Sequence, residues 1–274
     1  MRSIRSARVI AASVLLTVFV LLFAWMGAAV PVSVFVVHCE PTKANPIMWL
    51  ALCDLVLLAD QYAIPLSIDF TPQWAAMILD DTAKLETVQS WIDDGHEIGC
   101  HHHGYWGTKE HGSTWDGYTN TPVSELDLAD RAQYLGTMAD FMALLNALPG
   151  ERRSGCLGCS VEGDEIDYPC QLEYSTQGHA LEDALAVPEL IDRNGCQILE
   201  IGHALIASQE RGALQDLYIN TDDVCVFGVN GHVYNYADFS LQFEVWFAYL
   251  ASLDATGVRR GTVSEVLDGW VGAP

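Results

Sequence analysis

The chain has 274 residues, half of them hydrophobic, and its 36 acidic residues against 13 basic ones give a formal net charge of −23. This length and composition suit one large α/β domain or two small ones and argue against a disordered chain. The negative charge excludes nucleic acid as a partner, because it repels phosphate backbones, and it suits cation binding or a high-salt habitat, where counterions screen the self-repulsion.

The first 30 residues form a segment of their own. Arginines at positions 2, 5 and 8 precede an uncharged apolar run over 9–30, which is long enough to cross a bilayer as a helix. Arginines on the cytoplasmic side place the rest of the chain outside the cytoplasm. We therefore predict a single-pass, membrane-anchored protein with residues 1–30 as its anchor. The alternative is a cleaved signal peptide, which gives a secreted protein.

The first predicted strand covers 32–37, where a continuous apolar run is typical of a strand buried on both faces. It leads into His38-Cys39-Glu40-Pro41. Side chains alternate along an extended chain, so His38 and Glu40 share one face. The apolar spacing over 47–61 then predicts a helix, and a second strand is predicted over 64–70.

Two helical pieces and a third strand follow. Thr71-Pro72 supplies an N-cap and a proline at the first helical position, and we expect helix in two pieces as far as Asp94. Gly95 ends the helix, and a strand-like run with three adjacent histidines follows. The order β-α-β-α-β predicts parallel strands joined by helical crossovers.

Paired ligand-type residues therefore follow two of these strands. In an extended chain His101 and His103 share one face, and His102 takes the other. We expect them to meet the pair from the first strand, because the carboxyl ends of parallel strands lie at one edge of a sheet. Imidazoles with a carboxylate suit Zn²⁺ or a similar divalent ion. A solvated turn and ordinary core histidines are the alternatives.

The second half of the chain is predicted in less detail. A long loop rich in Trp and Tyr over 104–122 precedes an amphipathic helix over 124–148 capped by Ser124. The later predictions are a helix over 181–193 broken near Pro188, strands over 197–203 and 224–229, and helices over 236–255 and 262–270. We find no domain boundary within 31–274.

Eight cysteines in an exported chain permit disulfides, but the sequence leaves their pairing open. Cys156 and Cys159 form a single CxxC pair, for which a disulfide or free thiols are favoured over zinc. Cys39 and Cys100 each lie beside a suspected ligand, so they either approach each other in space or are small buried core residues.

Several of these motifs resemble the polysaccharide deacetylase (NodB-homology, carbohydrate esterase 4-like) superfamily. Gly95-His96-Glu97-Ile98-Gly99-x-His101 is similar to the family's second motif. The helix start at Thr71-Pro72-Gln73-Trp74, the closing stretch over 257–266, and a late strand followed by His232 also look like family features.

The resemblance implies an α/β fold, a distorted (β/α) barrel, with a divalent metal, expected to be Zn²⁺. It implies metal-dependent removal of N- or O-acetyl groups from an acetylated polysaccharide of the cell envelope or the extracellular space. Glu40 stands where the family has its acidic ligand, and His101 matches the first histidine ligand. Tyr105 occupies the position of the second histidine, so His103 is expected to serve instead, with His102 as the less favoured alternative.

The resemblance also implies catalytic roles. The family's paired aspartates become Cys39-Glu40 here, which leaves His38 as the base or as a fourth ligand. Arg153 matches the arginine that orients that base, and His232 matches the histidine that protonates the leaving group.

Two rival functions remain. One is a catalytically degenerate barrel that binds glycan without turnover. The other is a glycoside hydrolase in which Glu40 and either Glu162 or Asp164 form the carboxylate pair.

Overall fold

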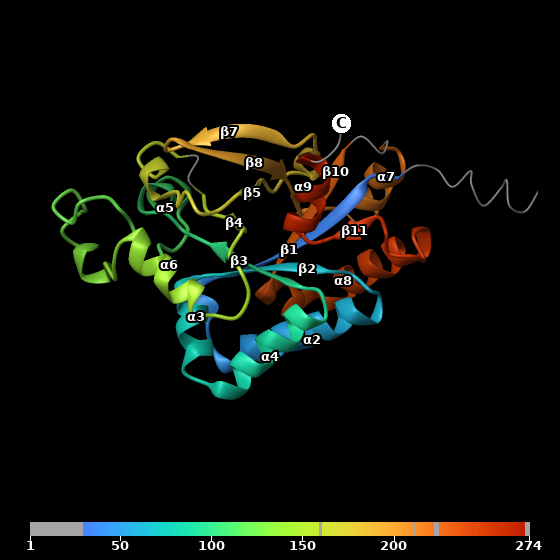
Figure 1. Cartoon of the computed structure of the whole chain (residues 1–274), viewed down its shortest axis with the longest axis horizontal. Helices are drawn as coiled ribbons and strands as arrows, with labels where there is room; N and C mark the ends of the chain where they lie inside the picture. Colours follow the sequence, from blue (N-terminus) through green and yellow to red (C-terminus); the bar gives the residue numbers. More distant parts are fainter. Residues whose placement is uncertain (1–29, 159–160, 211, 222–224, 272–274) are drawn as a thin grey trace, which may run out of the picture.

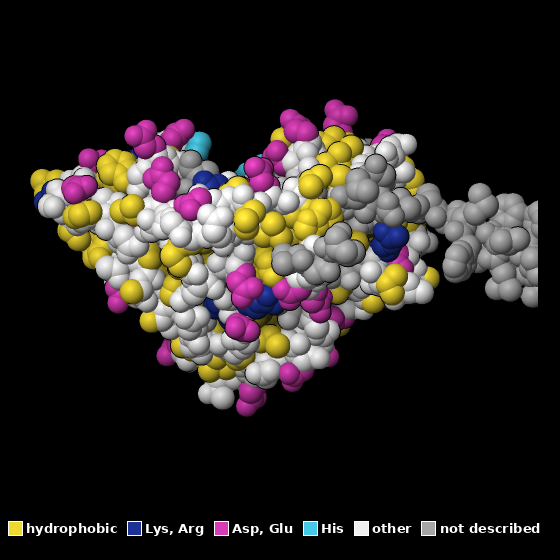
Figure 2. Space-filling model, turned by 45° about the horizontal axis from the view of Figure 1, so that its top comes forward, with side chains coloured by type: hydrophobic (Ala, Val, Ile, Leu, Met, Phe, Trp, Pro, Cys, Tyr) yellow, Lys and Arg dark blue, Asp and Glu magenta, His cyan; other side chains and the backbone are white. Residues whose placement is uncertain are grey.

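The computed structural model describes residues 30–271 except 159–160, 211 and 222–224. Almost all of the predicted anchor at 1–30 therefore lies outside the described residues. Within the described part, no helix has the length and apolar character needed to cross a membrane. On the face shown in Figure 2, acidic side chains far outnumber basic ones, in keeping with the composition.

Within the described residues, eleven strands take part in one sheet. Its main path runs β6-β10-β1-β2-β3-β4-β5-β8-β7, with β11 paired to β1 and β9 paired to β10. The strands are β1 (Val32–Cys39), β2 (Leu66–Phe70), β3 (Glu97–His101), β4 (Ser154–Cys156), β5 (Tyr174–Gln177), β6 (Leu185–Ala186), β7 (Glu189–Arg193), β8 (Cys196–Gly202), β9 (Ala204–Leu205), β10 (Val226–His232) and β11 (Arg260–Gly261).

The central strands are parallel, as predicted from the alternation of strands and helices. β1 pairs in parallel with both β10 and β2, and the register continues in parallel through β3, β4, β5 and β8. His38 stands opposite His232 on one side and Asp69 on the other. The carboxyl ends of these strands therefore lie at one edge of the sheet.

Helices cover the outer face of the sheet. In Figure 1, α2, α3, α4 and α8 lie together on one side of β1, β2 and β3, and their buried side chains share one apolar cluster with Phe35 and Val37 of β1. The helices are α2 (Pro46–Gln61), α3 (Pro72–Leu79), α4 (Thr82–Asp93), α5 (Tyr105–His111), α6 (Met138–Asn146), α7 (Ala213–Ile219), α8 (Val233–Leu253) and α9 (Val263–Val271).

The inner face of the sheet changes from apolar to polar along β1. Val34 and Val36 pack in a second cluster with Leu199 and Ile201 of β8, which Val263 and Leu267 of α9 help to close. The next two positions on the same face are His38 and Glu40, because side chains alternate along a strand. The inner face thus carries an apolar base near α9 and a layer of ligand-type residues above it.

The ends of the sheet curl toward each other. β9 follows β8 directly and pairs with β10, and Gly228 of β10 approaches Gly202 at the end of β8. A Cβ on Gly228 would lie 2.1 Å from the carbonyl oxygen of Gly202, so glycine is required for this approach. The sheet therefore forms a half-barrel that brings β1, β4 and β8 around one interior.

The predicted helix over 124–148 is wrong in its first half. The structure has turns and a short 3₁₀ helix (Arg131–Gln133) before α6 begins at Met138. Thr137 and Asp140 form a capping box, so the helix is capped at Thr137 and not at Ser124. The capping box at Thr137 and the preceding Gly136 favour a helix that begins at Met138, and they outweigh the apolar spacing that predicted a start at Ser124.

The predicted helix over 181–193 is also wrong. Only Leu181–Ala184 is a 3₁₀ helix, and β7 forms an antiparallel hairpin with β8. Asn194 and Gly195 form the turn, both with positive φ. Asn-Gly is the strongest short hairpin signal, and here it outweighs the helical spacing.

A disulfide joins Cys170 to Cys196 and closes a loop that contains β5, β6 and β7. Cys39 and Cys100 are buried free thiols. They do not meet, because Phe70 of β2 pairs with both and separates them by two strand spacings.

Candidate metal centre

The carboxylate of Glu40 lies among three imidazoles at the carboxyl ends of the strands. Its Oε1 is 3.3 Å from Nε2 of His101 and 3.1 Å from Nε2 of His232, and its Oε2 is 3.3 Å from Nε2 of His103. The three predicted ligands Glu40, His101 and His103 each offer one ligand atom within 4.8 Å of the others. The structure thus brings together the set that the sequence singled out.

Backbone carbonyls select the tautomers of His101 and His103. Nδ1 of His101 lies 3.0 Å from the carbonyl oxygen of Cys156, and Nδ1 of His103 lies 2.9 Å from that of Thr114. A carbonyl oxygen only accepts, so each Nδ1 carries the proton and each Nε2 presents a lone pair. The two Nε2 atoms are 2.9 Å apart.

Two lone pairs at this distance, both beside a carboxylate, repel unless a cation or a proton lies between them. Burial alone would raise the pKa of the Glu40 carboxyl, but when protons occupy the facing nitrogens of His101, His103 and His232, their hydrogen bonds hold that pKa well below its usual range. The carboxylate is therefore ionised at neutral pH. The imidazoles of His101 and His103, each held through Nδ1 by a backbone carbonyl, and the Glu40 carboxylate form a donor set that fits Zn²⁺ or a similar divalent ion.

His232 also lies beside Glu40, and we call Glu40, His101, His103 and His232 together the outer centre. Its Nδ1 lies 2.9 Å from Oδ1 of Asn235, the oxygen that also accepts the His232 backbone N–H. Its Nε2 faces Glu40. An imidazolium at His232 thus has an oxygen acceptor for each of its protons, so this ring can hold a proton next to the outer centre.

His38, expected as the base or a fourth ligand, lies one layer further into the interior. Its ring stacks on that of His101 with centroids 4.4 Å apart, and the residue is 1% exposed. Burial, with the neighbouring imidazoles adding to it, lowers the pKa of His38 well below its usual value. A general base works best with a pKa near the working pH. The expected base role is therefore revised: His38 is a neutral interior group.

Three residues near His38 were not identified as ligands from the sequence. His203 directly follows β8, with its ring centroid 5.1 Å from that of His38, and His179 lies 6.2 Å from His203. Cys156 ends β4 and forms a possible ligand group with His38 and His203. A usable signal existed for His203, because it is the last residue of the strand predicted over 197–203 and therefore lies at the same edge of the sheet as the predicted ligands.

The expected role of Arg153 is wrong. It precedes β4, whereas Cys156, whose carbonyl contacts His101, lies at the carboxyl end of that strand. The Arg153 guanidinium instead donates to Glu173 at 2.6 Å and Asp268 at 2.7 Å. These ion pairs connect α9 to the beginnings of β4 and β5. Arg153 therefore stabilises the fold and does not orient a base.

Other residues of the histidine-rich run are structural. Nδ1 of His96 accepts the Leu66 N–H at 3.0 Å. His102, on the opposite face from its neighbours, is enclosed by Asp116 at 2.7 Å and Asp167 at 3.5 Å. Asp116 also accepts the His103 backbone N–H. The face alternation predicted for this run is therefore observed, and His102 supports the ligand residues from behind.

The carboxylate pair of the glycosidase alternative does not form around Asp164. This side chain is fully buried, and its two oxygens accept the backbone N–H groups of Trp106 and Gly107 at the start of α5. Glu162 is exposed. Asp164 therefore anchors a helix end and is not available for hydrolysis.

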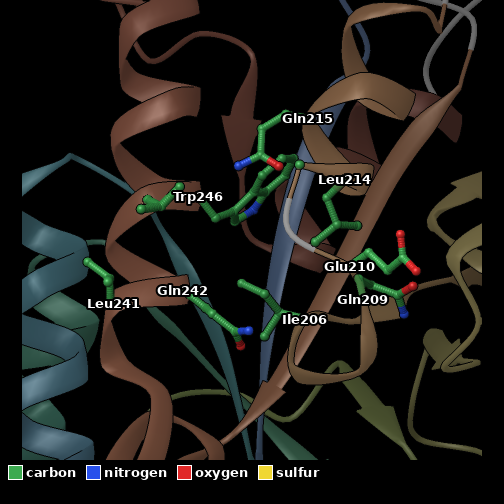
Figure 3. A pocket seen from close by; sticks show the side chains of 10 residues that line it. Ile206, Gln209, Glu210, Leu214, Gln215, Leu241, Gln242 and Trp246 are labelled. Atoms are coloured by element: carbon green, nitrogen blue, oxygen red, sulfur yellow. The ribbon is translucent and has the colours of Figure 1, made fainter.

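A separate surface pocket has no part in this chemistry. Figure 3 shows it between α7 and α8, lined by Leu214, Gln215, Leu241 and Trp246 among others. Among the described residues, its lining consists of apolar groups and amides with the acid Glu210, and it contains no histidine or cysteine. The residues of the outer centre lie outside it.

Comparison with known proteins supports the fold. Neither a protein-family model nor a curated protein matches the sequence. A structure from Mycobacterium smegmatis assigned as a polysaccharide deacetylase aligns with a TM-score of 0.51 at 9% identity, covering 89% of this chain and 94% of that one. A 4-alpha-glucanotransferase from Thermococcus litoralis aligns with a TM-score of 0.51 at 11% identity, covering 86% of this chain but 38% of that one.

A peptidoglycan deacetylase from Bacillus subtilis also aligns, with a TM-score of 0.44 at 11% identity over 87% of this chain and 91% of that one. At such identities a likeness shows the fold alone. The alignment with the Mycobacterium smegmatis structure, at a TM-score of 0.51, shows that the chain has a divergent polysaccharide deacetylase-like fold.

Proposed function

We propose that the chain is a metal-dependent hydrolase that removes N- or O-acetyl groups from a glycan. The observation that carries this is the convergence of Glu40 with the Nε2 lone pairs of His101 and His103. The fold supports it, because the centre lies at the carboxyl ends of the strands, where α/β folds place their chemistry.

Each residue of the outer centre has a definite task. Glu40, His101 and His103 would hold the divalent ion, with Zn²⁺ as the expected species. Such an ion acts as a Lewis acid toward a carbonyl and lowers the pKa of water to about 7. His232 would carry the protons, accepting one from water and delivering it to the departing amine or alcohol, because its ring touches Glu40 and is oriented by Asn235.

The expected location remains part of the proposal. We propose an anchored domain outside the cytoplasm, or a secreted one after signal cleavage, acting on envelope or extracellular glycan. The Cys170–Cys196 disulfide supports an oxidising compartment.

The test is acetate release from acetylated chitooligosaccharides and peptidoglycan fragments. We expect release that a chelator abolishes and Zn²⁺ restores. His101→Ala and Glu40→Gln should each lose more than about 100-fold, because even changes behind the ligands cost 10–100-fold at such sites. His111→Ala, an exposed histidine at the end of α5, is the matched control and should retain activity.

The outcomes separate the rival functions. Bound metal with no acetate release from any of these glycans would favour a glycan-binding role without turnover. Acetate release that survives His101→Ala would remove the outer centre from the reaction.

A further inference from the structure

A second group of ligand-type side chains lies deeper in the half-barrel than the outer centre. It consists of His38 from β1, Cys156 from β4 and His203 from the end of β8, with one ligand atom of each within 4.8 Å of the others. His38 precedes Glu40 by two positions on the same face, which places the two groups on the order of 7 Å apart along the strand. The two groups have no residue in common, so they are separate sets of ligands.

The histidines of this inner group have unsatisfied nitrogens. His38 is 1% exposed and His203 is fully buried. Nε2 of His38 and both ring nitrogens of His203 have no well-aligned hydrogen-bond partner among the described residues. Burying such groups unpaired is costly, so native interiors nearly always pair them or use them as ligands.

The chemistry of the group identifies its ligand. The group offers two imidazoles and a thiol and no carboxylate. Mg²⁺ and Ca²⁺ prefer oxygen ligands, so this set of nitrogen and sulfur ligands suits Zn²⁺ instead. The Asn230 side-chain amide lies 3.3 Å from Nδ1 of His38. The amide atom nearest to Nδ1 is the nitrogen, whereas Oδ1 of Asn230 has no hydrogen-bond partner among the described residues. Turning this amide over places Oδ1 against Nδ1–H, which leaves a lone pair on Nε2 of His38 for a metal.

We propose that His38, Cys156 and His203 form a second, inner binding site for a Zn²⁺-class ion. The Cys156 thiol loses its proton to solvent as the sulfur–metal bond forms, while both imidazoles bind in their neutral form. A divalent ion with one thiolate leaves a single positive charge in the interior. Asp69 is buried beside Cys156, and its Oδ1 has no hydrogen-bond partner among the described residues.

The inner site is coupled to the outer centre through Cys156 and His38. The Cys156 carbonyl accepts the Nδ1–H of His101 at 3.0 Å, and the His38 ring stacks on the His101 ring. An ion held by both residues would fix the two groups that orient His101. The inner site is thus a structural support for the outer one.

Cobalt titration of the metal-free full chain tests the inference, because a thiolate bound to Co²⁺ gives a near-ultraviolet charge-transfer band. We expect two ions bound per chain, with this band present. The band should disappear in Cys156→Ala and His203→Ala. It should remain in Glu40→Gln, which removes an outer ligand, and in Cys53→Ala, a half-buried free thiol on α2 that serves as the matched control.

A wild-type chain without the band, or a band that survives Cys156→Ala, would overturn the inner site. Glu40→Gln that still binds two ions would instead contradict the outer centre and the proposed function, leaving the inner site intact. If the Cys156 variant does not fold, alkylation of the wild-type chain, mapped by mass spectrometry, decides. Zn²⁺ should slow modification of Cys156 but not of Cys53, and equal slowing or none would overturn the proposal.

Discussion

The neighbours His102 and His103 show how alternation along an extended segment divides roles between adjacent identical residues. His103 faces Glu40 at the rim of the outer centre, whereas His102 is enclosed by Asp116 and Asp167 on the other face. The sequence predicted this division and favoured His103 as the ligand. It gave no indication of the two aspartates, because they come from distant loops.

Alanine at His103 should therefore affect metal binding, whereas alanine at His102 should affect stability. His103→Ala should lower Zn²⁺ affinity by more than about 10-fold with little loss of stability. His102→Ala should lower the free energy of unfolding by about 3–5 kcal/mol, because it leaves buried aspartates without their partner. Calorimetric Zn²⁺ titration and urea unfolding of both variants check this, and the reverse pattern would identify His102 as the ligand.

His102 also predicts a dependence of stability on pH. Burial alone would lower its pKa, but the charge of Asp116, the hydrogen bond to Asp116 and the nearby Asp167 carboxylate raise it to about 10. Its folded pKa thus exceeds the unfolded value of about 6.5. The stabilisation is fully present below about pH 6.5 and is lost as the pH rises toward 10.

Urea unfolding between pH 6 and pH 10 measures this dependence. The wild-type free energy of unfolding should decline across the range, and the decline should be smaller in His102→Gln, which does not titrate there. Equal pH profiles for the two proteins would contradict the assigned charge on His102.

At the scale of elements, the motif residue Glu97 ties four segments together. From β3, it accepts hydrogen bonds from Ser67 of β2 at 2.9 Å and Ser154 of β4 at 2.8 Å, and from the backbone N–H of Ser264 in α9 at 3.1 Å. Its partners lie at the amino-terminal side of the strands, away from Glu40. Glu97 therefore supports the fold and does not touch the outer centre.

Glu97→Ala should accordingly destabilise the protein and leave the metal site intact. Each hydrogen bond to a charged group contributes about 1.5–3 kcal/mol, so we expect a loss of at least about 3 kcal/mol in unfolding free energy. Zn²⁺ affinity of the folded variant should stay close to wild type, as it should in the control Glu86→Ala on the exposed face of α4. Lost affinity at unchanged stability would show that Glu97 acts at the site.

The sequence predicted the elements up to β3 well, because cap signals, glycines and periodicity agree there. Thr71-Pro72 and Gly95 bound the two helical pieces much as observed, α3 and α4. It failed in the first half of 124–148 and over 181–193, where helical spacing competes with stronger local chemistry: the Thr137–Asp140 capping box and the Asn194-Gly195 turn. The later predictions over 197–203, 236–255 and 262–270 agree with β8, α8 and α9. The inner site escaped prediction because its ligands come from three strands that become neighbours only when the sheet curls.

At the scale of the whole molecule, the net charge of −23 opposes compaction. Raising NaCl from about 0.1 M to 1 M shortens the Debye length from about 10 Å to about 3 Å, so the melting temperature at pH 7 should rise. Near the sequence pI of about 4.4 the net charge vanishes, and the effect should vanish with it. A melting temperature that falls with NaCl at pH 7 would mean that attractive ion pairs outweigh the repulsion.

The account depends on a cation held between Glu40, His101 and His103 at the carboxyl ends of the strands. An anomalous difference map at the zinc absorption edge, from crystals grown with Zn²⁺, measures this directly. We predict a peak within bonding distance of the Glu40 carboxylate and of Nε2 of both His101 and His103. A map with no peak at that position, and the carboxylate simply hydrogen-bonded to the imidazoles, would contradict the account.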